Sequence, residues 1–175
     1  MSASVETFET ARLHAERLRA SHFDEVQRMH SDARVMATLG GIRGEDQTRA
    51  LIRANDEHWQ QYGYGLWVFR DKTSAFAGRG GLRHLHVAGG AEIEVAYALV
   101  ADLWNRGLAT EMALAVVRLA FEELGIDTLV CFTLPTNHAS RRVMEKAGFR
   151  YERDVVHAGL PHVLYRLARG TSLTK

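Results

Sequence analysis

Apolar residues recur at three- and four-residue steps in several stretches of the chain, which is the spacing of an amphipathic helix. The clearest stretch runs from Glu45 to Tyr62 and ends at Gly63. Two later stretches are followed directly by Gly125 and Gly148, and glycine is the residue favoured just beyond a helix C-terminus. The pattern predicts helices after Ser21 and over residues 32–39, 45–62, 108–124 and 137–147.

Runs of alternating or continuous apolar residues between these helices predict strands. In residues 92–100, EIEVAYALV, the alternation places Ile93, Val95, Tyr97 and Leu99 on one face, and Glu92, Glu94, Ala96 and Ala98 on the other. Three glycines at 78, 80 and 81 predict a bulge in another run. The other predicted strands cover residues 10–20, 64–70, 75–87, 128–134, 149–156 and 162–167.

This order of elements predicts an α+β fold in which one mixed sheet is flanked by helices. It contains one β-α-β unit, formed by the strand 92–100, the helix that follows and the strand 128–134. No repeat or linker interrupts the pattern, so residues 1–175 are expected to form one domain. Its core is expected over residues 9–169, with a loose tail over 170–175.

Composition excludes several classes of function. The net charge of +1 gives no overall field that would attract nucleic acid or an anionic membrane. A single cysteine, Cys131, excludes an internal disulfide and a four-cysteine zinc site, and its apolar surroundings favour packing. His84 and His86 share a strand face but have no third ligand nearby, so no metal site is predicted. Without a signal-peptide pattern or an apolar run of bilayer length, the chain is expected to be cytoplasmic.

One segment between a strand and a helix suggests an anion site. In Leu103–Ala113, LWNRGLATEMA, the helix begins just after Gly107. Unpaired backbone N–H groups at the positive end of a helix dipole bind phosphate oxygens, and glycine lets a ligand approach the backbone. Taken alone, the segment is explained more simply by the packing of small residues at a helix start. Neither a P-loop lysine nor a G-x-G-x-x-G pattern is present here.

Four blocks of sequence resemble one known family. They are ETARLHAERL, SDARVMATLGG, EIEVAYALVADLWNRGLATEMA and PTNHASRRVMEKAGFRYE, and their spacing matches as well. On these blocks the chain resembles the GNAT superfamily of acetyl-CoA-dependent N-acetyltransferases over nearly its whole length. Within it, the chain is most similar to the branch that contains the ribosomal-protein N-terminal acetyltransferases.

The resemblance implies a mostly antiparallel, splayed sheet with acetyl-CoA between the strands 92–100 and 128–134. It implies that the pantetheine arm pairs with backbone groups and meets an asparagine, that a helix start binds the pyrophosphate, and that a serine lies near the thioester sulfur. At Trp104 the family often has glutamine or arginine, and either Arg141 or Arg142 is expected to contact a phosphate. The implied coenzyme residues are Leu99, Val100, Arg106, Gly107, Leu108, Ala109, Thr110, Asn137, Ser140 and Arg142.

The chemistry of acetyl transfer suggests two catalytic residues. The attacking amine must lose a proton, and Glu94, which matches the glutamate of the branch, is the candidate base; a solvated or arginine-paired carboxylate is the alternative. Glu92, nearer the strand end, is expected to be exposed. Many relatives have a tyrosine that protonates the leaving sulfur, and here Met144 occupies its position. Ser140 is therefore the candidate donor to the leaving sulfur.

The acceptor amine is left open by the sequence. A protein α-amine, with a pKa of about 7.7–8.0, needs less help from a base than a lysine with a pKa of about 10.4. A protein N-terminus is therefore the first candidate acceptor, and a small-molecule amine is the second. A module that binds acetyl-CoA with little catalysis is a third alternative, which the missing tyrosine favours. Monomer and homodimer are both compatible with the sequence.

Overall fold

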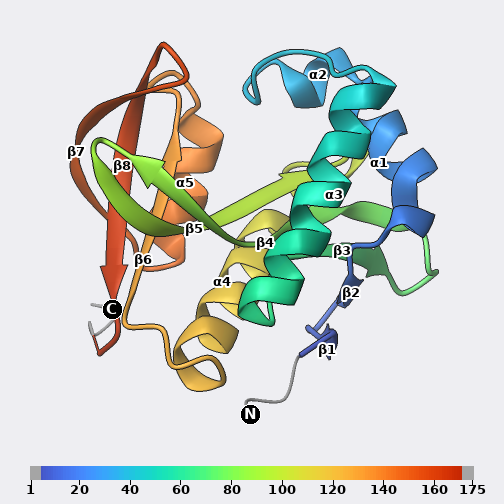
Figure 1. The fold of residues 1–175 in the computed structure, drawn as a ribbon, viewed down its shortest axis with the longest axis horizontal. Helices are drawn as coiled ribbons and strands as arrows, with labels where there is room; N and C mark the ends of the chain where they lie inside the picture. The colour runs from blue at the N-terminus through green and yellow to red at the C-terminus, as the bar shows by residue number, and fades with distance from the viewer. Residues whose placement is uncertain (1–4, 171–175) are drawn as a thin grey trace.

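One eight-stranded sheet forms the centre of the computed structural model, which describes residues 5–170 (Figure 1). The strands follow one another in the order β1-β2-β3-β4-β5-β6-β8-β7. All neighbours are antiparallel except β5 and β6, as the predicted mixed sheet requires. The strands are β1 Thr7–Glu9, β2 Leu13–Arg17, β3 Leu66–Asp71, β4 Phe76–Val87, β5 Gly90–Leu99, β6 Thr128–Thr133, β7 Arg150–His157 and β8 Leu160–Ala168.

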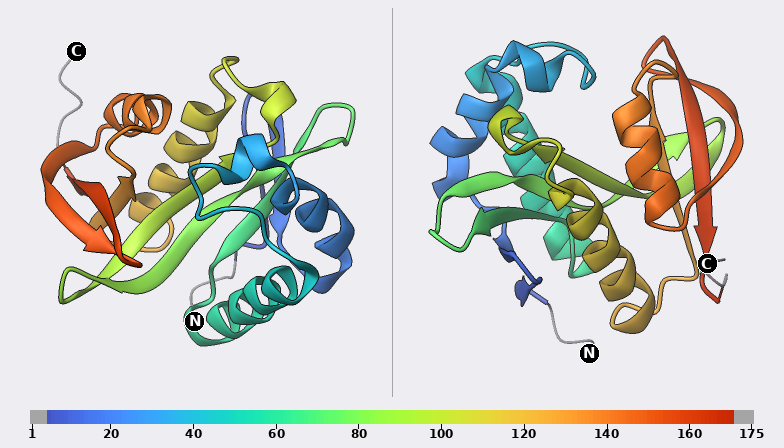
Figure 2. Two further views of the ribbon diagram at one scale, coloured as in Figure 1. Left: turned by 90° about the horizontal axis from the view of Figure 1, so that it is seen from above. Right: turned by 180° about the vertical axis from the view of Figure 1, so that it is seen from behind.

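Helices cover both faces of this sheet (Figure 2). On one face, Met112 and Val116 of α4 pack with Val95 and Leu99 of β5 in the main apolar core. On the other face, α1 and α3 cover β3, and α2 follows α1. The helices are α1 Phe23–His30, α2 Ala33–Met36, α3 Glu45–Tyr62, α4 Leu108–Glu122 and α5 His138–Lys146, with the short 3-10 turns η1 Ala20–His22 and η2 Ala101–Leu103.

The sheet opens between its two parallel strands. β5 and β6 are aligned at a single residue pair, Glu94 with Val130. β6 instead pairs along its whole length with β8, from Thr128 to Thr133. Beyond Glu94 the two parallel strands therefore separate, which confirms the splayed sheet expected from the family resemblance.

The predicted helices agree closely with the structure, and the helix 45–62 has the predicted bounds. The N-terminal strand differs: residues 10–20 contain only β2, and a separate strand β1 that the pattern did not predict precedes it. The expected bulge is present, because Phe69 faces Gly78 while Arg70 faces Phe76. Gly81 has φ 151°, and a Cβ there would lie 2.2 Å from the Gly65 carbonyl oxygen, so this position requires glycine.

Within residues 5–170, no helix combines the length and the apolar character needed to cross a bilayer. Most of the tail predicted over residues 170–175 lies outside the described residues.

Candidate functional site

The predicted phosphate-binding residues lie together where α4 begins. Asn105 and Gly107 have positive φ values of 60° and 75°, so the backbone turns sharply before the helix. Gly107 is the N-cap, and its missing side chain supplies no acceptor for the first N–H groups of the helix. The N–H groups of residues 108–110 therefore lie at the positive end of a 15-residue helix.

Arg12, which sequence reasoning did not select, anchors this turn. Its Nη1 donates to the Arg106 carbonyl oxygen at 2.8 Å, and its Nε donates to Glu111 of α4 at 2.7 Å. Thr10 and the Arg12 backbone N–H also donate to Glu111, and these hydrogen bonds lower the pKa of the carboxyl although burial opposes them. The segment between β1 and β2 thus holds the turn and the helix start together.

The backbone at the end of β5 is oriented by its pairing with β4. The Val100 N–H donates to the Ala77 carbonyl oxygen at 2.9 Å. Backbone groups alternate in direction along an antiparallel ladder, so those of Leu99 point the other way, toward the side where β6 diverges. The Trp104 indole N–H donates to the Leu99 carbonyl oxygen at 3.1 Å. Of the two residues predicted to pair with the pantetheine arm, Leu99 has the suitable orientation.

Asn137 begins α5 as its N-cap. Its Oδ1 accepts from the Ser140 N–H at 3.2 Å, and its Nδ2 donates to Thr133 Oγ1 at 3.0 Å. Arg141 donates to the Tyr165 hydroxyl and to the Pro135 carbonyl oxygen, both at 3.2 Å. These contacts fix the start of α5 against β6 and β8 and occupy Arg141.

Arg142, the next residue, is exposed and has no hydrogen-bond or ion-pair partner in the described chain. Of the two arginines proposed for a phosphate, Arg142 is therefore the one whose guanidinium is available.

Tyr97 is a further polar residue that the sequence pattern assigned only to the apolar face of β5. Its hydroxyl lies 2.8 Å from Ser140 Oγ and donates to the Ser140 carbonyl oxygen at 3.1 Å. Burial raises the pKa of Tyr97 well above its usual value, so the phenol stays protonated. A tyrosine that packs against a core needs a hydrogen-bond partner for its hydroxyl, and in the sequence this requirement was the only sign of the role of Tyr97.

Glu94 lies on the opposite face of β5 and is 5% exposed. Nε and Nη2 of Arg83 both donate to its Oε2, at 3.0 and 2.5 Å. Glu94 is therefore paired with an arginine and is not solvated. Because both bonds go to Oε2, Oε1 is left to accept a proton.

Glu92 was predicted to be exposed, and this prediction was wrong. Both of its carboxylate oxygens accept from Arg166 of β8, at 2.9 and 2.7 Å, and its side chain is 17% exposed. Glu92 and Arg166 are 74 residues apart, so the strand pattern alone carried no information about the pairing.

A group of arginines lies on the same sheet face as Glu94. Arg79 of β4 faces Ala98 across the ladder and is 5% exposed. Its Nε donates to His30 Nε2 at 3.2 Å, while His30 Nδ1 lies 2.8 Å from Thr48 Oγ1. Burial lowers the pKa of His30 to about 3, and the Arg79 charge acts in the same direction, so this histidine is neutral.

We expect His30 to make the protein less stable in mild acid. The unfolded side chain has a pKa near 6.5 and the folded one about 3, so between these values the unfolded state binds more protons. The free energy of unfolding should therefore fall as the pH decreases below 6.5, by at most about 1.4 kcal/mol per pH unit from this residue. Urea unfolding of His30→Gln at pH 7 and pH 5 should show a smaller loss than the wild type. The exposed His86→Gln should behave as the wild type, and equal losses in all three proteins would contradict the assignment.

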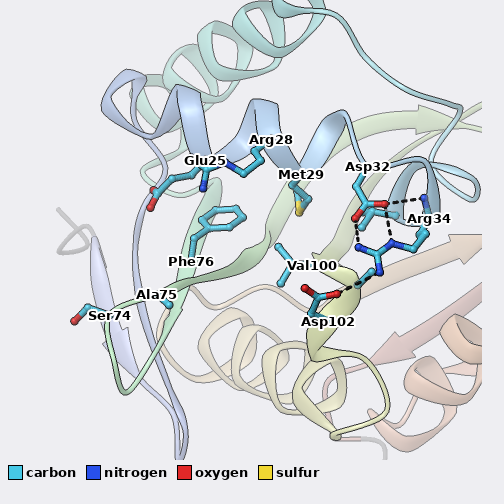
Figure 3. A pocket seen from close by; sticks show the side chains of 12 residues that line it. Glu25, Arg28, Met29, Asp32, Arg34, Ser74, Ala75, Phe76, Val100 and Asp102 are labelled. Carbon is cyan, nitrogen blue, oxygen red and sulfur yellow. Dashed lines mark hydrogen bonds and ion pairs between the residues drawn. The ribbon is translucent and has the colours of Figure 1, made fainter.

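A hollow of about 490 Å³ opens on the same face of the sheet, between α1, α2, the start of β4 and the segment after β5 (Figure 3). Met29, Phe76 and Val100 form its apolar part. Asp32 and Asp102 both accept from Arg34 at its rim, where they link α2 to η2. Val100 is the only predicted coenzyme residue that lines it.

The described residues contain no group of three or more histidine, cysteine or acidic side chains placed to hold a metal ion. His84 is hydrogen-bonded instead, with its Nε2 2.7 Å from the Tyr64 hydroxyl. Cys131 is buried, as predicted, and burial raises the pKa of its thiol.

Comparison with known proteins agrees with this geometry. A family model described as an acetyltransferase (GNAT) domain matches residues 12–150. The uncharacterized protein YkkB of Bacillus subtilis (strain 168) is 29% identical over 138 residues, which cover 78% of this chain and 80% of that protein.

Solved structures show the same fold. A putative GnaT-family acetyltransferase from Bordetella pertussis is 26% identical and has a TM-score of 0.82, with 93% of this chain and 99% of that chain covered. RimL, a ribosomal L7/L12 α-N-protein acetyltransferase solved with coenzyme A, has a TM-score of 0.76 over 93% of this chain and 98% of that chain. At 16% identity, the likeness to RimL concerns the fold alone. The family match, the splayed sheet and the glycine turn before α4 together establish that this chain belongs to the GNAT acetyltransferases.

Proposed function

We propose that the protein transfers an acetyl group from acetyl-CoA to a primary amine by direct attack in a ternary complex, with a protein N-terminal α-amine as the first candidate acceptor. The observation that carries this proposal is the position of Glu94, a buried carboxylate at the single pair that joins β5 to β6. The opening of the sheet begins there, so a base at this residue lies where an amine and a thioester can meet. A cytoplasmic location is expected for such a reaction.

The residues around the opening fit a coenzyme. Gly107 lacks a Cβ at the turn before α4, and the N–H groups of residues 108–110 suit a pyrophosphate. The backbone of Leu99 and the amide of Asn137 would hold the pantetheine arm, and Arg142 a phosphate. When bound, acetyl-CoA supplies an acetyl group activated as a thioester.

Glu94 is proposed to take the proton that the attacking amine loses, on its Oε1, directly or through one water. The Arg83 pair keeps Oε2 fixed, so the carboxylate has a defined orientation. An α-amine with a pKa of about 7.7–8.0 is already partly neutral at pH 7, which reduces the demand on this base.

Ser140 and Tyr97 are proposed to supply the proton for the departing sulfur. Ser140 Oγ would donate its proton to the sulfur. The Tyr97 hydroxyl, which donates to the Ser140 carbonyl oxygen, would turn to Ser140 Oγ, 2.8 Å away, and replace that proton. Because its pKa is raised, the phenol would take up a proton from solvent once the thiol leaves. Met144 is 1% exposed and belongs to the core. In this proposal the hydroxyl pair takes the place of the missing tyrosine as the acid, and its position at 2.8 Å favours an enzyme over a binding module.

The test is thiol release from acetyl-CoA against a panel of peptides with different N-termini, amino acids and polyamines. We expect turnover with at least one peptide α-amine and none with polyamines. Turnover confined to small amines would support the second candidate acceptor. Tight coenzyme binding without turnover on the whole panel would contradict the proposed enzyme.

Removal of the Arg12 side chain should weaken acetyl-CoA binding. Arg12 is half-exposed, and each contact of this kind is worth up to about 1 kcal/mol, so Arg12→Ala should raise the KM for acetyl-CoA roughly fivefold. The value of kcat should change little, because Arg12 contacts the turn and not the reacting groups. Arg19→Ala, which removes a similarly exposed arginine paired with Glu6, is the matched control. Equal KM values in the two variants would exclude the anchoring role of Arg12.

A further inference from the structure

Arg79 is a buried cation without a carboxylate partner. It is 5% exposed, and no acidic side chain forms an ion pair with it in residues 5–170. The one hydrogen bond of its side chain among the described residues runs from Nε to the neutral His30. The two terminal nitrogens of the guanidinium thus have no acceptor in that part of the chain.

The charges around Arg79 make its unpaired positive charge still less favourable. Burial lowers the pKa of Arg79, and the charges of Arg83 and Arg43 act in the same direction. Glu94 acts in the opposite direction but is already bound to Arg83. Of these three guanidinium groups, only that of Arg83 forms an ion pair with a carboxylate in the described chain.

A buried guanidinium without an anionic partner lowers the stability of the protein unless a ligand supplies that partner. A buried charge without a partner destabilises a protein, whereas apolar replacements of buried charged groups are often neutral or stabilising. The buried polar atoms that lack any partner in the described chain are Arg17 Nε and Gln27 Oε1. The terminal nitrogens of Arg79 are not among them, so they reach accessible space and are not sealed in the core.

We propose that Arg79 binds a carboxylate of the acceptor, so that the substrate is an amine that also carries a carboxylate. The inference rests on the proposed function, which places the amine at Glu94. Glu94 and Arg79 lie on the same face of the sheet. The planar guanidinium offers two parallel N–H donors that match a carboxylate. The carboxylate belongs either to an amino acid or to an acidic residue at a peptide N-terminus.

Pairs of acceptors that differ only in the carboxylate test this proposal. The peptide arm compares C-terminally amidated Asp-Ala-Ala with Asn-Ala-Ala, and the small-molecule arm compares L-glutamate with L-glutamine α-amide, which carries no carboxylate. Hydrogen bonds to charged groups favour a preference of at least about tenfold in kcat/KM for the acidic member of one pair. The pair that shows the preference identifies the source of the carboxylate. Equal rates within both pairs would overturn the proposal.

The variant Arg79→Met then tests whether Arg79 causes the preference for acidic acceptors. The ratio of kcat/KM values for the acidic and amide acceptors should fall close to one. The melting temperature of the free protein should stay the same or rise, because the substitution removes an uncompensated buried charge. Arg118→Met, on the exposed side of α4, should keep the wild-type ratio.

A lower melting temperature combined with an unchanged ratio would show that Arg79 is structural and would overturn the assignment. If Arg79→Met does not fold, Arg79→Lys retains the charge but not the two parallel donors, and it should reduce the ratio without abolishing it.

Different experimental results would overturn this inference and the proposed function. An enzyme that acetylates amines with no preference for carboxylates would overturn only the role of Arg79. A protein that binds acetyl-CoA but acetylates no amine would overturn the proposed function. In that case, a thermal shift with N-acetyl-L-glutamate but not with N-acetyl-L-glutamine α-amide, lost in Arg79→Met, would still support the carboxylate site.

Discussion

Glu94→Gln is expected to lower kcat/KM about 100-fold or more, because removal of a general base typically costs two to four orders of magnitude. Glutamine keeps the size of the side chain and leaves a carbonyl oxygen that can still accept from Arg83. It cannot take a proton from the attacking amine. The KM for acetyl-CoA should change little, since the phosphate-binding turn lies at the far end of β5. Steady-state kinetics with the best acceptor from the panel would measure both values.

Glu92→Gln is the matched control for this prediction. Glu92 lies two residues away on the same face of the same strand and is also paired with an arginine. The substitution makes the same chemical change in a comparable ion pair, and it should leave kcat/KM within about twofold. Equal losses in the two variants would show that ion pairing on this face, and not proton transfer at Glu94, controls the rate.

The sequence predicted the helices well because their signals are local. In α3, the three- and four-residue spacing and the glycine that follows lie within one segment, and the observed bounds agree with the prediction. β1 was missed because three residues carry too little periodicity to show a strand. Its place in the sheet comes from pairing with β2.

The site was only partly predictable, because only some of its features depend on residues that are adjacent in sequence. The glycine turn before α4 can be read from adjacent residues, whereas the partners of the key side chains are far away in sequence. Arg79 and His30 are 49 residues apart, and Tyr97 and Ser140 are 43 apart. Alternation along β5 placed Tyr97 on an apolar face, and only the packing of α5 shows where its hydroxyl points.

Tyr97→Phe is expected to lower kcat about ten- to 100-fold while the KM for acetyl-CoA changes little. Phenylalanine keeps the partly buried ring but removes the hydroxyl that contacts Ser140. Because burial raises the pKa of Tyr97 well above 10, the wild-type rate should show no loss from its ionisation up to about pH 9. The rate of the variant should be lower at every pH in this range.

Tyr165→Phe separates this role from simple support of α5. Tyr165 also contacts the helix through its hydroxyl, by accepting from Arg141 and donating to Glu145, but from β8 and away from Ser140. Its substitution should leave kcat close to that of the wild type. If Tyr97 acts through Ser140, Ser140→Ala and the double variant should each lose about as much kcat as Tyr97→Phe, because groups that act as one unit are not additive. Additive losses would mean that the two hydroxyls act separately, and the proton for the departing sulfur would then reach it without Tyr97.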